Sequence, residues 1–120
     1  MNRNRRPQNN NRANSNLSLT LHKADAAMVA RNWTAAIEAY RQALQNNPRN
    51  AEAWTNLGGA YLETGSTRKA REALNRAYKI HPSSIPLLGN LANLEKQTGE
   101  IREAESFYRK ILSKDPKLAR

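Results

Sequence analysis

Apolar and small residues in the middle of the chain recur at gaps of three and four, in two consecutive stripes. These stripes are Trp54, Leu57, Gly58, Tyr61 and Leu62, then Ala70, Ala73, Leu74, Ala77 and Ile80. Such spacing places each stripe on one face of a helix. Gly65 suits the left-handed conformation that ends a helix, and Pro82 cannot continue the second helix. We therefore predict two helices within residues 51–84, with a tight turn at Gly65 and a hydroxyl cap from Ser66 or Thr67.

The same pattern returns along the chain with a period of 34 residues. Four columns keep this step: Pro48, Pro82, Pro116; Ala36, Ala70, Ala104; Ala24, Gly58, Ala92; and Tyr40, Leu74, Tyr108. A period of about 20–50 residues is typical of stacked supersecondary units that bury their apolar faces against each other. We predict an all-α solenoid, residues 17–118, of three helix-turn-helix repeats at about 17–50, 51–84 and 85–118.

The second repeat resembles a tetratricopeptide repeat. The residues that carry the likeness are Trp54, Leu57, Gly58, Tyr61, Gly65, Ala70, Ala77 and Pro82. The flanking repeats depart from the pattern at Thr20 (tryptophan expected), Ala27 (tyrosine), Arg31 (glycine), Glu95 (tyrosine) and Ile111 (alanine). The resemblance covers about residues 17–118. It implies a right-handed superhelix whose first helices line a concave groove, where members of the family usually bind a peptide.

Carried along the 34-residue step, the resemblance also indicates the groove residues. They are His22, Asp25, Asn56, Glu63, Asn90, Asn93, Lys96 and Gln97. Asn56 and Asn90 stand one repeat apart, and a side-chain amide offers both a donor and an acceptor to a peptide backbone. The two asparagines could instead satisfy carbonyls of neighbouring helices or face water.

A second ligand mode of the family is a cationic clamp on the C-terminal carboxylate of heat-shock chaperones. The corresponding positions here hold Leu21, Asp25, Gly89 and Asn93, and only Asn56 matches the clamp. We therefore predict that the chain does not bind a chaperone tail in this way.

The net charge of +10 is unevenly distributed. Residues 1–16 are rich in asparagine, contain no acid and hold Arg3, Arg5, Arg6 and Arg12. With almost nothing to bury, this segment is expected to be a disordered basic tail. It is either a solubilising tail or cloning remnant, an arm that places its arginines on the phosphates of RNA, DNA or an acidic membrane, or, with weaker support, a mitochondrial presequence.

Two further surfaces stand out. One is a basic cluster on the second helix of the middle repeat, either a solvated outer face or a second electrostatic contact; its members are Arg68, Lys69, Arg71, Arg76 and Lys79. The other is the apolar stripe Phe107, Tyr108, Ile111 and Leu112, which only four residues follow after Pro116. Since an uncovered apolar face usually marks an interface, we expect this end to dock a partner or a second copy of the chain.

Nothing in the sequence supports catalysis. Cysteine is absent, which excludes disulfides, thiolate nucleophiles and cysteine-based metal sites. His22 and His81 stand alone, and no paired histidines or glycine-rich phosphate loop occur. We expect no cofactor and no metal. No apolar run reaches the roughly 18 residues of a membrane helix and no secretory signal is visible, so we expect a cytoplasmic protein.

The sequence thus predicts a non-catalytic scaffold that binds a protein or peptide segment in its groove and helps to assemble a larger complex. A second hypothesis is a component of a ribonucleoprotein or other nucleic-acid particle that uses the basic tail. A third is a regulatory subunit of an enzyme whose chemistry lies on another chain.

Overall fold

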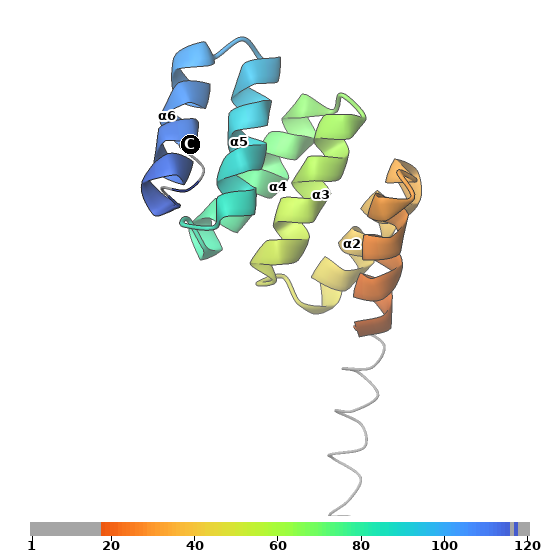
Figure 1. Ribbon diagram of the computed structural model, residues 1–120. Helices are drawn as coiled ribbons and strands as arrows, with labels where there is room; N and C mark the ends of the chain where they lie inside the picture. Colours follow the sequence, from red (N-terminus) through yellow and green to blue (C-terminus); the bar gives the residue numbers. More distant parts are fainter. Residues whose placement is uncertain (1–17, 116, 118–120) are drawn as a thin grey trace, which may run out of the picture.

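The computed structural model of the protein describes residues 18–115 and 117 (Figure 1). In that part of the chain every regular element is a helix, apart from turns and a short 3-10 segment at residue 117. Residues 18–29 form the first helix, and five more follow: α2 (Trp33–Asn46), α3 (Ala51–Glu63), α4 (Thr67–Ile80), α5 (Ile85–Gln97) and α6 (Ile101–Lys114). The predicted all-α solenoid is confirmed. None of the described helices is long and apolar enough to cross a membrane.

The helices stack in the order of the chain. The paired helices of the second and third repeats, α3 with α4 and α5 with α6, pack against each other, and α2 packs on α3. α3 and α5 also touch directly and run side by side in Figure 1, with α4 behind them. The first helices of the second and third repeats therefore share one wall of the molecule.

Each intra-repeat turn uses one residue with a positive φ. These residues are Arg31 (φ 60°), Gly65 (φ 75°) and Gly99 (φ 85°), one repeat apart. The helix end predicted at Gly65 is present, with the Gly65 N–H donating to the Leu62 carbonyl at 3.1 Å. Arg31 adopts the same left-handed conformation with a Cβ, which costs roughly 1–2 kcal/mol that glycine avoids.

Side chains cap three of the helices at their N-termini. Asn32, Asn50 and Ser84 accept hydrogen bonds from the main-chain N–H groups of residues 35, 53 and 87. The hydroxyl cap predicted for α4 is wrong. Ser66 occupies the N-cap position but makes no side-chain cap bond; its Oγ lies 3.2 Å from the Thr64 hydroxyl, which takes it away from the helix end.

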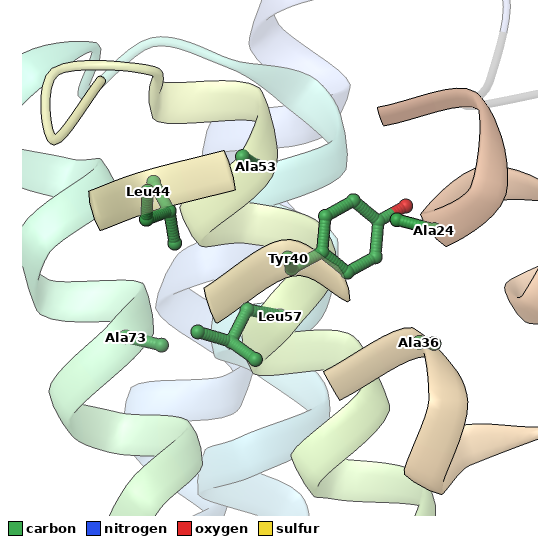
Figure 2. Packing of buried hydrophobic residues seen from close by; sticks show 7 residues of the cluster. All are labelled: Ala24, Ala36, Tyr40, Leu44, Ala53, Leu57 and Ala73. Atoms are coloured by element: carbon green, nitrogen blue, oxygen red, sulfur yellow. The ribbon is translucent and has the colours of Figure 1, made fainter. Parts of the chain in front are cut away.

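Two apolar cores follow one another along the stack. In the first core, Tyr40 points from α2 toward the helix that carries Ala24, and Leu57 of α3 packs beside it (Figure 2). The second core joins α3, α4 and α5 through seven buried residues: Leu62, Ala70, Leu74, Ala77, Leu87, Leu91 and Leu94. Because each core takes residues from two successive repeats, no repeat completes its core alone.

Candidate functional site

A cavity of about 280 Å³ opens on the wall formed by the first helix, α3 and α5. Met28 and Leu62 supply apolar surface in corresponding columns, and Trp33 of α2 closes one side. The polar lining consists of five of the residues predicted from the sequence: Asn56, Glu63, Asn90, Asn93 and Gln97. We refer to this cavity as the amide groove, since most of its polar groups are neutral side-chain amides.

Asn90 ties the two repeats together within the amide groove. Its Nδ2 donates to the main-chain carbonyl of Thr55 on α3 at 3.2 Å. Gly59 makes room for this contact, because a Cβ at that position would lie 3.2 Å from the same Nδ2. Of the two roles considered for Asn90, the bond to a helix carbonyl is therefore present. Its Oδ1 makes no hydrogen bond to another described residue.

Asn56 stands where the amide groove meets a second, smaller cavity of about 60 Å³. In the smaller cavity the Tyr40 hydroxyl donates to Oδ1 of Asp25 at 2.5 Å, and Asn56 lines the same cavity. Burial raises the pKa of the Tyr40 phenol, and the bond to Asp25 raises it further. Asp25 thus contacts a buried tyrosine and does not line the larger cavity.

The third repeat contains the counterpart of this pair. The Tyr108 hydroxyl donates to Oδ1 of Asn93 at 3.3 Å, so Asn93 keeps its Nδ2 for another partner. In the middle repeat the same columns hold Leu74 and Gly59, which cannot form such a bond. These side-chain pairs were not predicted, although the sequence shows both tyrosines fifteen residues after an Asp or Asn.

Other predicted residues lie apart from the amide groove. His22 and Lys96 are exposed and line none of the described cavities. At the end of the stack Phe107 packs against the second core and Ile111 is half-buried, while Tyr108 and Leu112 are 41% and 39% exposed. The tail residues Arg3, Arg5, Arg6 and Arg12 lie outside the described part of the chain.

The chemistry of the amide groove is that of a binding surface. Asn56, Asn90 and Asn93 can donate to or accept from a main chain, and Met28 and Leu62 can pack against an apolar side chain. Among the described residues, no three His, Cys, Asp or Glu side chains come together in a way that could hold a metal ion.

Comparison with known proteins gives a consistent result. Two family models, both described as tetratricopeptide repeat, match residues 21–85 and 67–120. Superkiller protein 3 of Schizosaccharomyces pombe is 36% identical over 84 residues, which is 70% of this chain and 6% of that protein. The chain spans 6%, 8% and 45% of the lengths of the first three curated relatives that it matches.

Solved structures show the same fold. The Arabidopsis OM64 TPR domain matches with a TM-score of 0.80 and 22% identity, covering 85% of this chain and 84% of that one. The first TPR of Spaghetti (RPAP3), bound to an HSP90 peptide, matches with a TM-score of 0.78 and 19% identity, covering 83% of this chain and 79% of that one. At these identities the likeness is one of fold.

Proposed function

The chain belongs to the tetratricopeptide repeat family, and from this premise we propose that it is a non-catalytic scaffold that binds a partner segment in the amide groove and helps to assemble a larger complex. Members of the family generally mediate protein–protein interaction, and the fold is typically a non-catalytic module. The proposal assigns that role to a particular wall of this chain, the one formed by the first helix, α3 and α5.

The observation that carries the proposal is a row of three side-chain amides within the amide groove, two of which keep one polar group unpaired. Asn90 uses its Nδ2 on Thr55 and Asn93 uses its Oδ1 on Tyr108, so each keeps one polar end. Asn56 contributes a third amide on the neighbouring helix. Donors and acceptors set along two adjacent helices match the alternating N–H and C=O groups of an extended chain.

This lining favours a particular kind of ligand. Neutral amides hold a main chain with little regard to its sequence, while Met28 and Leu62 favour one apolar side chain beside it. A free C-terminal carboxylate is a poorer fit, since Glu63 lines the cavity and Lys96 does not. We therefore retain the prediction that this chain does not clamp a chaperone tail, although the RPAP3 domain of similar fold is bound to an HSP90 peptide.

The test is affinity capture from native lysate with the wild-type chain, Asn56→Ala and a matched control. Asn75→Ala makes the same chemical change at an exposed position of α4 that lines none of the described cavities. A segment captured by the wild type is then synthesised and its Kd is measured against all three proteins. We expect Asn56→Ala to weaken binding about tenfold and Asn75→Ala to leave it unchanged.

Two results would contradict the proposal. A partner bound equally by wild type and Asn56→Ala does not use the amide groove. A bound fraction dominated by nucleic acid and lost when residues 1–16 are deleted would favour the ribonucleoprotein hypothesis, because binding would then depend on the tail arginines.

A further inference from the structure

The largest of the described cavities lies on the other side of α3 from the amide groove. It measures about 440 Å³ and is bounded by α2, α3 and α4. From α3 it is lined by Trp54, Leu57 and Tyr61, whereas Asn56, Gly59 and Glu63 line the amide groove. At 3.6 residues per turn these two sets occupy opposite faces of α3. We refer to this second cavity as the outer crevice.

The outer crevice has an aromatic floor and a basic rim. Trp54 and Tyr61 are half-buried, and the indole Nε1 donates to the Pro48 carbonyl at 2.7 Å, which fixes the ring. The guanidinium of Arg76 lies 5.2 Å from the centre of the Trp54 ring, and the Lys69 ammonium lies 5.9 Å from that of Tyr61. The charged groups of the lining are three cations, Arg41, Lys69 and Arg76, and one acid, Glu72.

The outer crevice is not a general consequence of the repeat. One repeat later, the position of Ala73 holds Phe107, which packs against the second core. There the positions of Tyr61 and Lys69 hold acids, Glu95 and Glu103. The first junction between repeats therefore combines a small residue with aromatic and basic neighbours, and the second does not.

From this combination we propose that the outer crevice is a second binding site, independent of the amide groove, for an acidic protein segment that inserts one aromatic or large aliphatic side chain. The inserted side chain packs over Ala73 between Trp54 and Tyr61, and flanking carboxylates pair with Arg41, Lys69 and Arg76. A volume of about 440 Å³ is ample for one large side chain and its neighbours. Carboxylates would complement the excess of positive charge on the rim.

The same features favour an acidic peptide over RNA. Single-stranded nucleic acid binds basic grooves by stacking its bases on open aromatic faces. Here a cation lies over each ring, Arg76 over Trp54 and Lys69 over Tyr61, so a base could stack on that face only by displacing the cation.

The experiment is a fluorescence-anisotropy titration with the full chain at about 0.15 M salt, where long-range attraction is largely screened. The probe is a fluorescein-labelled peptide of glutamate and aspartate with one central phenylalanine. A control peptide has alanine in place of the phenylalanine, and a labelled uridylate decamer tests RNA. We expect the phenylalanine peptide to bind with a Kd of about 100 µM or tighter, and at least about fivefold more tightly than either control.

The matching variant is Ala73→Phe, which plugs the outer crevice with the residue found at position 107 and changes no charge. It should reduce binding of the phenylalanine peptide about tenfold, whereas Asn56→Ala in the amide groove should leave it unchanged. Equal binding to Ala73→Phe, equal affinity for the alanine peptide, or no binding would overturn the proposal. RNA binding that exceeds peptide binding and is lost in Ala73→Phe would assign the outer crevice to nucleic acid instead.

A second pair of variants keeps the test decisive if Ala73→Phe fails to fold. Arg41→Ala with Arg76→Ala removes two cations from the rim, and Arg68→Ala with Lys79→Ala removes two exposed cations of α4 that do not line the outer crevice. The first pair should weaken the phenylalanine peptide about fivefold or more, and the second less than about twofold. Equal losses would show that only overall charge matters and would reject the site.

Discussion

Arg71 of α4 places its Nη1 2.7 Å from Oε1 of Glu95 on α5, across the junction between the second and third repeats. The Glu95 side chain is 8% exposed and that of Arg71 44% exposed. Oε1 has no hydrogen bond of acceptable geometry, so the ion pair is its partner. One repeat earlier the same columns hold Ile37 and Tyr61, which both pack against the first core. An ion pair at one junction thus replaces two apolar side chains at the other.

Because Arg71 and Glu95 form an ion pair, substitutions at these two positions should have coupled effects on the free energy of unfolding. Arg71→Ile should lower the free energy of unfolding by about 1–3 kcal/mol, because a nearly buried carboxylate loses its charged partner. Adding Glu95→Tyr reproduces the pair found at the first junction and should recover most of the loss. Urea denaturation followed by circular dichroism measures both. A double variant no more stable than Arg71→Ile alone would show that the two columns are not coupled.

Gly58 and Leu74 are a second pair of contacting residues whose columns hold other residues in the other repeats. A Cβ on Gly58 would lie 2.5 Å from Cδ2 of the fully buried Leu74. Gly58→Ala should therefore cost about 1–3 kcal/mol through overpacking. In the other repeats the two columns hold alanine with tyrosine, as in Ala24 with Tyr40. We expect Gly58→Ala with Leu74→Phe, which supplies the ring without a hydroxyl that would lack a partner beside Gly59, to be more stable than Gly58→Ala alone in the same denaturation assay. Additive losses would argue against this pairing.

Arg31 offers a stabilising substitution. It holds φ 60° in the position where Gly65 and Gly99 stand in the following repeats. Arg31→Gly should raise the free energy of unfolding by about 0.5–1 kcal/mol, since the relief of left-handed strain exceeds the lost contact of the guanidinium with the Trp33 ring at 5.8 Å. This corresponds to a rise in Tm of a few °C by scanning calorimetry. A lower Tm would show that the contact with Trp33 outweighs the strain.

The hydroxyl of Tyr40 predicts a change of stability at high pH. Burial and the bond to Asp25 raise the pKa of this phenol in the folded state above its ordinary value near 10. Because the pKa of Tyr40 is higher in the folded than in the unfolded state, its hydroxyl contributes fully to the free energy of unfolding below about pH 10. This contribution is lost as the pH rises through the folded-state pKa.

Tyr40→Phe isolates this contribution. At neutral pH it should cost about 1 kcal/mol, because the hydrogen bond to Asp25 is lost. Between about pH 9 and pH 11 its free energy of unfolding should fall less than that of the wild type, since the other tyrosines titrate in both proteins. Urea midpoints across this range measure the difference, and parallel curves would mean that Tyr40 titrates alike in the folded and unfolded states.

The repeat spacing was sufficient to predict the helical architecture. Gly65 and Pro82 mark helix ends because their backbone preferences act locally, so these helix ends can be predicted from the sequence alone. The predicted hydroxyl cap at Ser66 is wrong because this hydroxyl lies against that of Thr64, two residues away, and makes no bond to the helix end. That competition depends on side-chain orientation, which the residue pattern does not reveal.

The contacts between repeats could not be predicted from the sequence in this way. The bond from Asn90 to Thr55 depends on the space left by Gly59, and the pair of Arg71 and Glu95 depends on how far α4 and α5 approach each other. Both are set by packing between helices that are separated along the chain. The outer crevice likewise has Ala73 in its lining, which the sequence shows only as one more small residue in an apolar stripe.

The most direct measurement of the central claim is the ¹⁵N–¹H spectrum of the full chain titrated with the captured partner segment, read at its side-chain amide signals. Binding in the amide groove predicts that the NH₂ signals of Asn56, Asn93 and Gln97 shift together while that of Asn75 stays in place. Shifts confined to residues of α2, α4 and α6, with these three amides unmoved, would contradict it.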